Sequence, residues 1–346
     1  MLVSEYNYDL PEEVIAKKTP KIRGTTRLLA LNRKTGTVTD SYYRDLADFL
    51  EPGDLIILND TRVMRSRVFT ERESDGHPRE LVVLERHDKK IDHVMYRGKL
   101  HAGEKLIVKN VTNGEKTDDT ITIKEILGNG TATAVGTRPL EEIAQDYGNV
   151  PLPPYMHRDA EKDDIERYQT VWAKELGSAA APTASLNMTK ELIAKLEAKK
   201  VQVKYLTLHV GLGTFLPIRT DKVEEHKMHS EWFQIPDDTV EAIKATKAAG
   251  HRVIAVGTTV TRTLEFWAKT GKTEGEDDIF IFPGFEFQVI DALVTNFHAP
   301  KSTVLMLTAA FAGWNNLKPA YEHAIKSGYK LLSYGDSMLI YGDKNA

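Results

Sequence analysis

The second half of the chain alternates apolar strand-like runs with helix-like segments, and this alternation restricts the fold more than any other feature. Strands are predicted at residues 201–210, 253–256, 289–297 and 330–333, and helices at residues 189–200, 236–249, 261–269, 304–312 and 319–327. Strands that alternate with helices pair mainly in parallel, and the helices cover both faces of the sheet. The pattern therefore predicts an α/β fold with a mostly parallel sheet core flanked by helices.

The pattern changes between residues 63 and 149, where short alternating runs are separated by Gly, Asn or Asp turns. These runs are ELVVLER, IDHVMYR, EKLIVKNV, DTITIKEI and TATAVGT. Closely spaced strands of this kind form small barrels or sandwiches. We therefore predict an inserted small antiparallel β-barrel domain at 63–149, within an α/β catalytic core formed by residues 1–62 and 150–346. The proline-rich stretch 150–154 is interpreted as a stiff return linker.

The stretch 289–312 reads as a strand, a polar turn and an apolar helix. The turn carries the polar residues Asn296, His298, Lys301, Ser302 and Thr303. Because side chains alternate along a strand, Asn296 and His298 are expected to point the same way. Ser302 can cap the helix that follows. The arrangement predicts a ligand site at the carboxyl end of the sheet, and the alternative is a capped helix beside a core histidine.

A second polar cluster begins at Gly257, where an apolar strand runs into a helix rich in hydroxyl groups. The free N–H groups and dipole at such a helix start favour an anion, so Thr258 and Thr259 are candidate ligand-binding residues. Arg262 and Glu265 are three residues apart, which predicts that they share a helix face and pair. The alternative is a surface ion pair without a functional role.

A glycine-rich run also follows a predicted strand, directly after His209. Gly211, Gly213 and Thr214 are expected to let backbone N–H groups approach a ligand closely. The run is not a dinucleotide-binding fingerprint, because Leu216 occupies the sixth position where that motif has glycine. A simple tight turn is the alternative.

Further candidates lie in loops and at helix starts. Thr183 belongs to a small, polar loop at 177–189 that we expect to close over a ligand. Asp60 can act as a base or cap a turn, and Asp336 can orient a histidine or satisfy turn amides. Tyr321 and His323 are expected at a helix start, pointing to different faces.

A metal site is the weaker interpretation of the histidines near residue 230. His226, His229 and Glu231 have a spacing that resembles a ligand set, but they lack the helical H-E-x-x-H arrangement. The sequence also has no cysteine, which excludes disulfides, thiolate zinc sites and iron–sulfur clusters and fits the cytoplasm. We therefore predict that the site has no metal.

The remaining composition limits the partners. No apolar run is long enough to cross a membrane, and the N-terminus lacks the pattern of a signal peptide. The formal net charge of −4 gives no general attraction to nucleic acid. A nucleic-acid partner would therefore need a local basic patch.

Many long blocks, in one order and spread over nearly the whole chain, resemble the S-adenosylmethionine:tRNA ribosyltransferase-isomerase family of queuosine biosynthesis. These blocks are YDLPEEVIA, GDLIILNDTRV, VPLPPY, ERYQTV, GSAAAPTA, LHVGLGTF, EEHKMHSEWF, VGTT, RTLE, IFIFPGFEFQVIDALVTNFHAPKST, AYEHAI and SYGDSMLI. The resemblance implies a two-part α/β core with an inserted β-barrel. It also implies transfer and isomerisation of the ribosyl unit of S-adenosylmethionine onto the aminomethyl-7-deazaguanine base at the tRNA wobble position. The products are epoxyqueuosine-tRNA, adenine and methionine.

The resemblance also implies partners and site residues. S-adenosylmethionine is the ribosyl donor, tRNA is bound through its anticodon loop, and neither a metal, a membrane nor an obligate protein partner is expected. We expect catalysis by His209, Arg262, Glu265, His298 and Asp60. Substrate binding is expected from Gly211, Gly213, Thr214, Thr183, His229, Glu231, Thr258, Thr259, Asn296, Lys301, Ser302, Tyr321, His323 and Asp336. Arg62, Arg65 and Arg67 are expected to contact tRNA phosphates.

The chain departs from the family pattern at several positions. Ser185-Leu-Asn-Met-Thr189 stands where the family usually has Gly-Leu-His-Phe-Thr, Leu216 replaces an arginine, Val260 replaces a serine, and Gly98-Lys-Leu-His101 replaces a Pro-Ala-Lys-Arg-like stretch. We expect three of these changes, at Asn187, Leu216 and Val260, to lie in the loops of the site, where they remove an imidazole, a guanidinium and a hydroxyl. The changes at Ser185, Asn187, Met188, Leu216 and Val260 leave open whether substrate or activity is altered. The alternatives are a divergent paralogue acting on another nucleoside or RNA, a non-catalytic RNA-binding homologue, or a metallohydrolase that uses His226 and His229.

Overall fold

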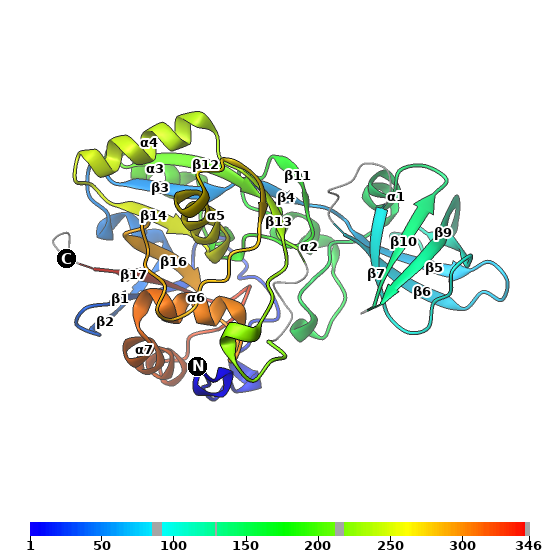
Figure 1. The fold of residues 1–346 in the computed structure, drawn as a ribbon, viewed down its shortest axis with the longest axis horizontal. Coiled ribbons are helices and arrows are strands. Elements are labelled where there is room, and N and C mark those ends of the chain that lie inside the picture. The colour runs from blue at the N-terminus through cyan, green and yellow to red at the C-terminus, as the bar shows by residue number, and fades with distance from the viewer. Residues whose placement is uncertain (85–91, 129, 212–217, 343–346) are drawn as a thin grey trace.

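An α/β core carries a closed β-barrel at one end (Figure 1). In this computed structural model, residues 1–84, 92–128, 130–211 and 218–342 are described. The core contains a nine-stranded sheet with the order β15-β13-β12-β3-β14-β16-β17-β1-β2. The predicted α/β class and the predicted antiparallel barrel are both confirmed.

The strands fall into three sheets. The large sheet contains β1 (Arg27–Asn32), β2 (Val38–Tyr42), β3 (Leu55–Asn59), β12 (Gln202–Leu208), β13 (Glu231–Gln234), β14 (Val253–Val256), β15 (Glu274–Asp277), β16 (Ala292–Asn296) and β17 (Ser337–Tyr341). The barrel closes in the order β10-β7-β6-β5-β8-β9 from β5 (Arg67–Arg72), β6 (Pro78–Val83), β7 (Asp92–Tyr96), β8 (Lys105–Lys109), β9 (Lys116–Gly128) and β10 (Thr131–Gly136). A two-stranded sheet pairs β4 (Thr61–Val63) with β11 (Glu175–Ser178).

The centre of the large sheet is parallel and antiparallel pairs flank it on both sides, although β1 pairs with β17 in parallel. Strands β12, β3, β14 and β16 pair in parallel, as the alternation of strands and helices predicts. Strands β13 and β15 on one side, and β17 against β16 and β2 against β1 on the other, pair antiparallel. The parallel centre is the part of the sheet whose carboxyl ends meet at one edge.

Helices cover both faces of this sheet. The described helices are α1 (Leu140–Tyr147), α2 (Lys162–Arg167), α3 (Lys190–Ala198), α4 (Asp237–Ala248), α5 (Thr258–Thr270), α6 (Thr303–Ala312) and α7 (Trp314–Lys326), with 3-10 turns η1 (Val3–Glu5), η2 (Glu12–Val14), η3 (Tyr43–Phe49), η4 (Pro154–Met156), η5 (Thr183–Ser185) and η7 (Val223–Glu225). Helix α1 packs on the barrel instead of on this sheet. Strand β3 shows why both faces are apolar: Leu55 and Ile57 pack with residues of α4 to α7, whereas Ile56 and Leu58 pack with residues of α3 and η3. Each such buried side chain contributes roughly 1.5–3 kcal/mol.

The prediction of a strand at residues 330–333 is wrong. Leu331 makes only an isolated bridge to Ile15, and the last strand, β17, begins later at Ser337. The Asp336 carboxylate accepts the backbone N–H groups of Lys330 (2.7 Å) and Arg27 (2.6 Å). These bonds hold the segment before β17 as a compact turn, in which Leu332 has a φ of 70°.

Two helices begin earlier than their sequence patterns predict. Helix α5 starts at Thr258 rather than residue 261, because Gly257 (φ 100°) supplies the turn and its carbonyl accepts the Thr261 N–H. Helix α7 starts at Trp314, after Gly313 (φ 77°), and continues through Pro319. The placement of Tyr321 and His323 at a helix start is therefore wrong, since both lie in the second half of α7.

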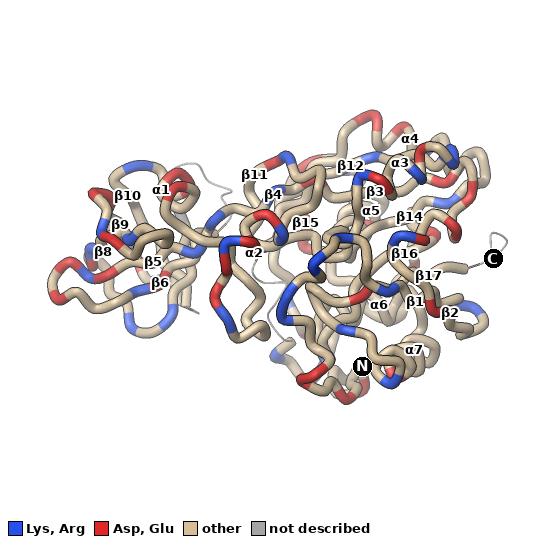
Figure 2. Tube along the Cα trace, turned by 180° about the vertical axis from the view of Figure 1, so that it is seen from behind, with Lys and Arg blue, Asp and Glu red and all other residues tan. Residues whose placement is uncertain are grey.

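Charged residues of both signs are spread along the chain in the core and in the barrel (Figure 2). None of the helices within the described ranges is long and apolar enough to cross a membrane.

Candidate functional site

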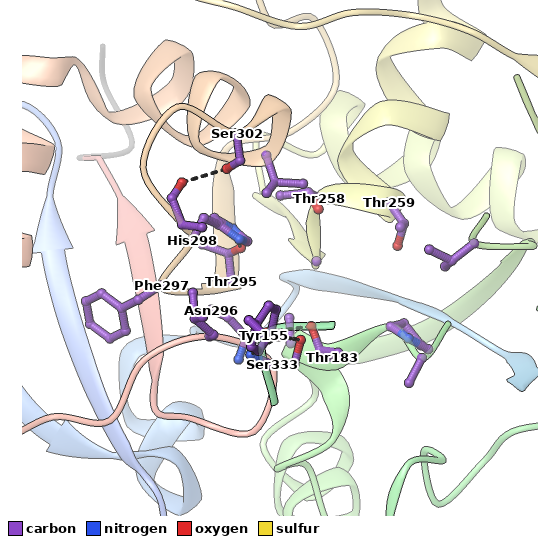
Figure 3. A pocket seen from close by; sticks show the side chains of 18 of the residues that line it. Tyr155, Thr183, Thr258, Thr259, Thr295, Asn296, Phe297, His298, Ser302 and Ser333 are labelled. Atoms are coloured by element: carbon purple, nitrogen blue, oxygen red, sulfur yellow. Dashed lines mark hydrogen bonds between the residues drawn. The ribbon is translucent and has the colours of Figure 1, made fainter. Parts of the chain in front are cut away.

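A cavity lies at the carboxyl ends of β14 and β16, next to the first turns of α5 and α6 (Figure 3). Its volume is about 160 Å³, against roughly 10–15 Å³ for one water molecule. Its polar lining consists of Tyr155, Thr183, Thr258, Thr259, Thr295, Asn296, His298, Ser302 and Ser333. Six of these are site residues predicted from the sequence, namely Thr183, Thr258, Thr259, Asn296, His298 and Ser302. Open α/β sheets bind ligands at the edge formed by the carboxyl ends of their parallel strands, and the cavity lies at this edge.

Two helix N-termini face the cavity. Thr258 and Thr259 form the start of the thirteen-residue helix α5, and Ser302 caps the ten-residue helix α6. The free N–H groups of a helix start, together with the helix dipole, attract an anionic group. The Thr259 hydroxyl is buried and makes no hydrogen bond within the described chain. The arrangement can therefore hold a carboxylate or a phosphate.

Asn296 presents a fixed hydrogen-bond donor to the cavity. Its Oδ1 accepts the Thr183 hydroxyl at 2.8 Å, which leaves Nδ2 as the free end of the amide. Asn296 is 2% exposed and Nδ2 has no hydrogen-bond partner in the described chain. A buried donor without a partner costs about 1–3 kcal/mol. A ligand that accepts this hydrogen bond recovers that cost, so the site favours a polar ligand at this wall.

His298 is held at both its backbone and its ring. Its N–H donates to the Tyr321 hydroxyl (2.9 Å) and its carbonyl accepts the Tyr8 hydroxyl (2.6 Å). The ring Nε2 lies 2.7 Å from Thr295 Oγ1. Burial lowers the pKa of His298 to about 3, so the imidazole is neutral at physiological pH.

Tyr155 and Ser333 line the same cavity and were not among the residues predicted from the sequence. The Tyr155 hydroxyl donates to Ser333 Oγ and accepts the Ser333 N–H at 3.1 Å. Burial raises the pKa of Tyr155 to about 12. Both ionisable side chains of the described lining, Tyr155 and His298, are therefore neutral at pH 7. The block VPLPPY, interpreted as a linker, was the signal for Tyr155, and the wrong strand at 330–333 concealed Ser333.

The Ser302 side chain that caps α6 is expected to stabilise the protein. Ser302 Oγ accepts the Leu305 N–H (3.2 Å) and donates to the Ala299 carbonyl (2.7 Å). Because Ser302→Ala removes both bonds, we expect the free energy of unfolding to fall by about 1 kcal/mol. Urea denaturation measures the change. Ser302→Thr keeps a capping hydroxyl and serves as the control; equal stabilities of the alanine and threonine variants would contradict this role.

Arg262 does not pair with Glu265, so that prediction is wrong. Arg262 NH1 lies 2.5 Å from Glu231 Oε2, and NH2 donates to the Asp277 carbonyl at 3.2 Å and lies 3.7 Å from Asp277 Oδ1. Burial works to lower the pKa of Arg262, but the two carboxylates outweigh it and raise that pKa. Burial also raises the pKa of Asp277. Arg262 adjoins a small cavity beside Thr258 and Thr259, but it does not line the cavity that contains His298 among the described residues.

Glu265 lies deeper along α5 and holds the entry to β16. Its carboxylate accepts the backbone N–H groups of Gln288, Val289 and Ile290 at 2.8, 3.0 and 3.1 Å. Burial raises the pKa of Glu265, against the effect of these hydrogen bonds. Glu265 is 1% exposed and lies outside the described cavity lining. Its contacts are those of a structural carboxylate.

A second group of predicted residues lies near the end of β12 and outside the described cavity lining. His209 Nδ1 lies 2.8 Å from Thr61 Oγ1, and its ring stacks on Trp232 with centroids 5.1 Å apart. Asp60 accepts the Thr207 hydroxyl (2.7 Å), and burial raises the pKa of Asp60. The Gly211 N–H donates to Glu231 Oε1 at 2.8 Å. Gly213, Thr214 and Leu216 lie outside the described residues.

The other predicted binding residues lie around the site rather than in it. Tyr321 supports the His298 backbone, Asp336 satisfies turn amides, His323 pairs with Asp40 at 2.9 Å, and Lys301 and His229 are exposed. Within the part of the chain that the structure describes, no group of three or more His, Asp or Glu side chains could hold a metal ion. The set of His226, His229 and Glu231 is therefore not a ligand cluster.

The three arginines predicted to bind tRNA differ in their surroundings. Arg67 is bound by Glu80 (2.8 Å) and Asp159 (2.7 Å), so its charge is already balanced. Arg65 is half-buried and donates to the Gln145 carbonyl at 3.4 Å. Arg62 is exposed. Arg62 thus remains the predicted residue whose charge is most accessible to a phosphate.

Four of the described departures from the family pattern, Ser185, Asn187, Met188 and Val260, are buried. Met188 packs in the cluster beneath α3, and Val260 packs in the cluster between α4 and α7. Ser185 is fully buried, and Asn187 Nδ2 donates to the Gly335 carbonyl at 3.2 Å. None of these four lines the cavity. Ser185 does lie in a site loop, since it shares η5 with Thr183, which lines the cavity. Whether these changes alter substrate or activity stays open.

The fold and cavity define a class: an α/β protein with an inserted β-barrel and a polar ligand cavity at the carboxyl edge of its sheet. A family model described as "Queuosine biosynthesis protein" matches residues 3–340. The chain belongs to this family.

Curated relatives and a solved structure support the assignment. The S-adenosylmethionine:tRNA ribosyltransferase-isomerase of Pelodictyon phaeoclathratiforme is 51% identical, over 98% of this chain and 100% of that protein. The enzyme of the same name from Sulfurihydrogenibium sp. is 42% identical, again over 98% and 100%. The crystal structure of S-adenosylmethionine tRNA ribosyltransferase from Thermotoga maritima has a TM-score of 0.55 and 32% identity, and covers 97% of this chain and 99% of that one.

Proposed function

We propose that this protein is an S-adenosylmethionine:tRNA ribosyltransferase-isomerase. It transfers the ribosyl moiety of S-adenosylmethionine to the aminomethyl-7-deazaguanine base of tRNA and isomerises it to epoxyqueuosine, with release of adenine and methionine. Full-length similarity at about 50% identity to enzymes of that name carries the proposal. The cavity supports it, because two helix N-termini and a neutral imidazole suit a zwitterionic sulfonium ligand.

The charges of the donor match the cavity walls. The methionine carboxylate binds at the first turns of α5 and α6, where Thr258, Thr259 and Ser302 lie. The Asn296 amide donates to a polar atom of the adenosyl part. The sulfonium and the ribose lie between these walls, next to His298. A neutral His298 accommodates the adjacent positive sulfur, since a protonated imidazole would repel it.

The chemistry needs a proton acceptor and a proton donor. The sulfonium acidifies the ribose C5′ hydrogens, and a positioned base removes one of them. With Nε2–H donating to Thr295 Oγ1, Nδ1 of His298 is the atom that takes this proton. The proton then passes from His298 to adenine as the bond between the ribose and adenine breaks and the leaving base takes the electron pair.

The proposal includes the setting of the reaction. The acceptor is the 7-deazaguanine at the wobble position of the tRNA anticodon loop, so the protein acts in the cytoplasm. No metal, membrane or obligate protein partner takes part. His209 and Asp60 remain candidates for positioning the acceptor base. Gly213, Thr214, His229 and Glu231 remain candidates for binding it.

Release of adenine tests the function. The protein is incubated with S-adenosylmethionine and tRNA carrying the aminomethyl-deazaguanine, and adenine and the modified nucleoside are followed by liquid chromatography with mass detection. We expect equal amounts of adenine and epoxyqueuosine. RNA binding without adenine release would identify a non-catalytic homologue, and adenine release only with another RNA would identify a divergent paralogue.

A further inference from the structure

A second cavity lies where the barrel meets the core, with a volume of about 390 Å³. One wall comes from the barrel, at the strands β5, β6 and β7. The other wall is the segment 151–159, which leads from the barrel back into the core. We refer to this cavity as the junction cleft. Its relevant lining residues are Met95, Tyr96 and Arg97 on the barrel side and Pro153, His157 and Arg158 on the core side.

The cavity that contains His298 is called the donor cavity below, because it is proposed to hold S-adenosylmethionine. The junction cleft and the donor cavity share one short piece of chain. Pro153, Pro154 and His157 line the junction cleft, while Tyr155 lines the donor cavity and bonds to Ser333. Consecutive Cα atoms are about 3.8 Å apart, so the two cavities are separated here by the thickness of a single residue. A polymer whose reacting unit enters the donor cavity therefore has its neighbouring units beside the junction cleft.

Most cations of the junction cleft already have partners. Arg67 is bound by Glu80 and Asp159, and Arg158 by Asp164 at 2.7 Å. Figure 2 shows the two signs of charge together around α2, where the barrel joins the core. Arg97 differs, because it is exposed and its side chain makes no hydrogen bond or ion pair with the described residues. Arg97 is thus the guanidinium that is available to an external anion.

The surface next to Arg97 is aromatic and apolar. Tyr96 and Met95 are half-buried, so part of each side chain remains open to the cleft. Opposite them, the prolines of segment 151–154 form a wall that has few backbone N–H groups and little conformational freedom. An aromatic face next to a free cation is the combination that binds single-stranded nucleic acid, by stacking a base and holding a phosphate.

We propose that the junction cleft binds the single-stranded RNA segment that flanks the target nucleoside. Tyr96 stacks on a neighbouring base and Arg97 contacts a backbone phosphate. This inference rests on the proposed function, since it takes RNA as the substrate. It moves the RNA contact from Arg67, whose charge is balanced, to Arg97, whose charge is free. It also explains why the barrel is joined to the core through the segment that carries Tyr155.

The test measures RNA and donor binding separately with the full-length protein. The RNA probe is a synthetic anticodon stem-loop with the aminomethyl-deazaguanine at the wobble position, followed by fluorescence anisotropy over a range of salt concentrations. S-adenosylmethionine binding is measured by calorimetry. The variants are Arg97→Ala, Arg97→Lys, Tyr96→Ala and Tyr96→Phe. Lys124→Ala is the matched control, because Lys124 is an exposed cation on β9, outside the cleft lining.

Loss of the stacking ring in Tyr96→Ala should weaken RNA binding roughly 5- to 100-fold. Arg97→Ala should also weaken RNA binding and reduce the salt slope by about 0.7, the value for one phosphate contact on a single strand. Tyr96→Phe and Arg97→Lys should retain most of the affinity. All variants should bind S-adenosylmethionine as the wild type does, and Lys124→Ala should change neither affinity.

Two results overturn the inference, and they are distinguishable. If Tyr96→Ala, Arg97→Ala and Tyr96→Phe all bind RNA within twofold of the wild-type affinity, RNA does not enter the junction cleft. Adenine release by the wild type would still support the proposed function in that case. A wild-type protein that neither binds the stem-loop nor releases adenine would refute both.

Discussion

Replacement of His298 by glutamine should lower the rate of adenine release about 10²- to 10⁴-fold, the usual contribution of a proton-transfer group. Glutamine keeps a polar side chain of similar length near Thr295, but it cannot take a proton from the ribose carbon. S-adenosylmethionine affinity should change little, because the carboxylate and the adenosyl group are held by other walls. Single-turnover adenine release and calorimetry measure the two quantities.

His226→Gln is the matched control, since His226 is a half-buried histidine that packs edge to face against Phe280 outside the donor cavity. It should retain the wild-type rate. A His298→Gln variant that keeps more than a tenth of the wild-type rate would show that another group moves the proton. A large loss in donor affinity with an unchanged rate constant would instead make His298 a binding residue.

The ionisation of His298 makes the stability of the protein depend on pH. The folded-state pKa, about 3, lies below the ordinary value of 6.5 because of burial. Protonation therefore favours the unfolded chain, and this contribution to stability is lost as the pH falls from about 6.5 toward 3. His298→Gln should reduce that acid sensitivity. The rate of the wild type should show no ionisation of His298 between pH 5 and pH 8, as ring proton shifts in NMR spectra can confirm.

Replacement of Arg262 by methionine should lower the free energy of unfolding by about 3–5 kcal/mol. The side chains of Arg262, Glu231 and Asp277 are 7%, 2% and 0% exposed. Removal of the guanidinium takes away the positive charge that both buried carboxylates contact, and the cost of keeping them buried exceeds the lost attraction. The shift of the urea denaturation midpoint measures the effect.

Arg219→Met is the matched control, because Arg219 is exposed and surface substitutions usually change stability by less than about 0.5 kcal/mol. Arg262→Met with wild-type stability would contradict a structural role for the charged cluster. Correct folding of Arg262→Met, with unaltered donor affinity but no adenine release, would restore Arg262 as a catalytic residue.

The sequence predicts those parts of the fold that depend on local patterns. The apolar run at Leu55–Asn59 and the helix signals after it indicate a parallel sheet covered on both faces, because periodicity records burial directly. Alternating runs with turn residues between them likewise indicate the barrel. Asn296 and His298 both line the cavity, as predicted, but strand alternation is not the reason, because β16 ends at Asn296 and the consecutive residues 295–298 all line it.

Partners brought together by the tertiary fold are not encoded in local spacing. Arg262 and Glu265 have the spacing of a helical pair, but Glu231 lies on a different element and outcompetes the neighbour on the helix. Glu265 instead meets backbone amides of the chain that leads into β16. Ser333 begins the block SYGDSMLI, but its spacing does not indicate the cavity, because its position depends on Asp336 folding the preceding segment into a turn.

A crystal structure with S-adenosylmethionine bound would test the central claim most directly. The account predicts the methionine carboxylate within about 2.7–3.2 Å of first-turn N–H groups of α5 or α6, and the ribose C5′ next to the His298 ring. A donor bound in the junction cleft, or one bound in the donor cavity without contact to either helix start or to His298, would contradict it.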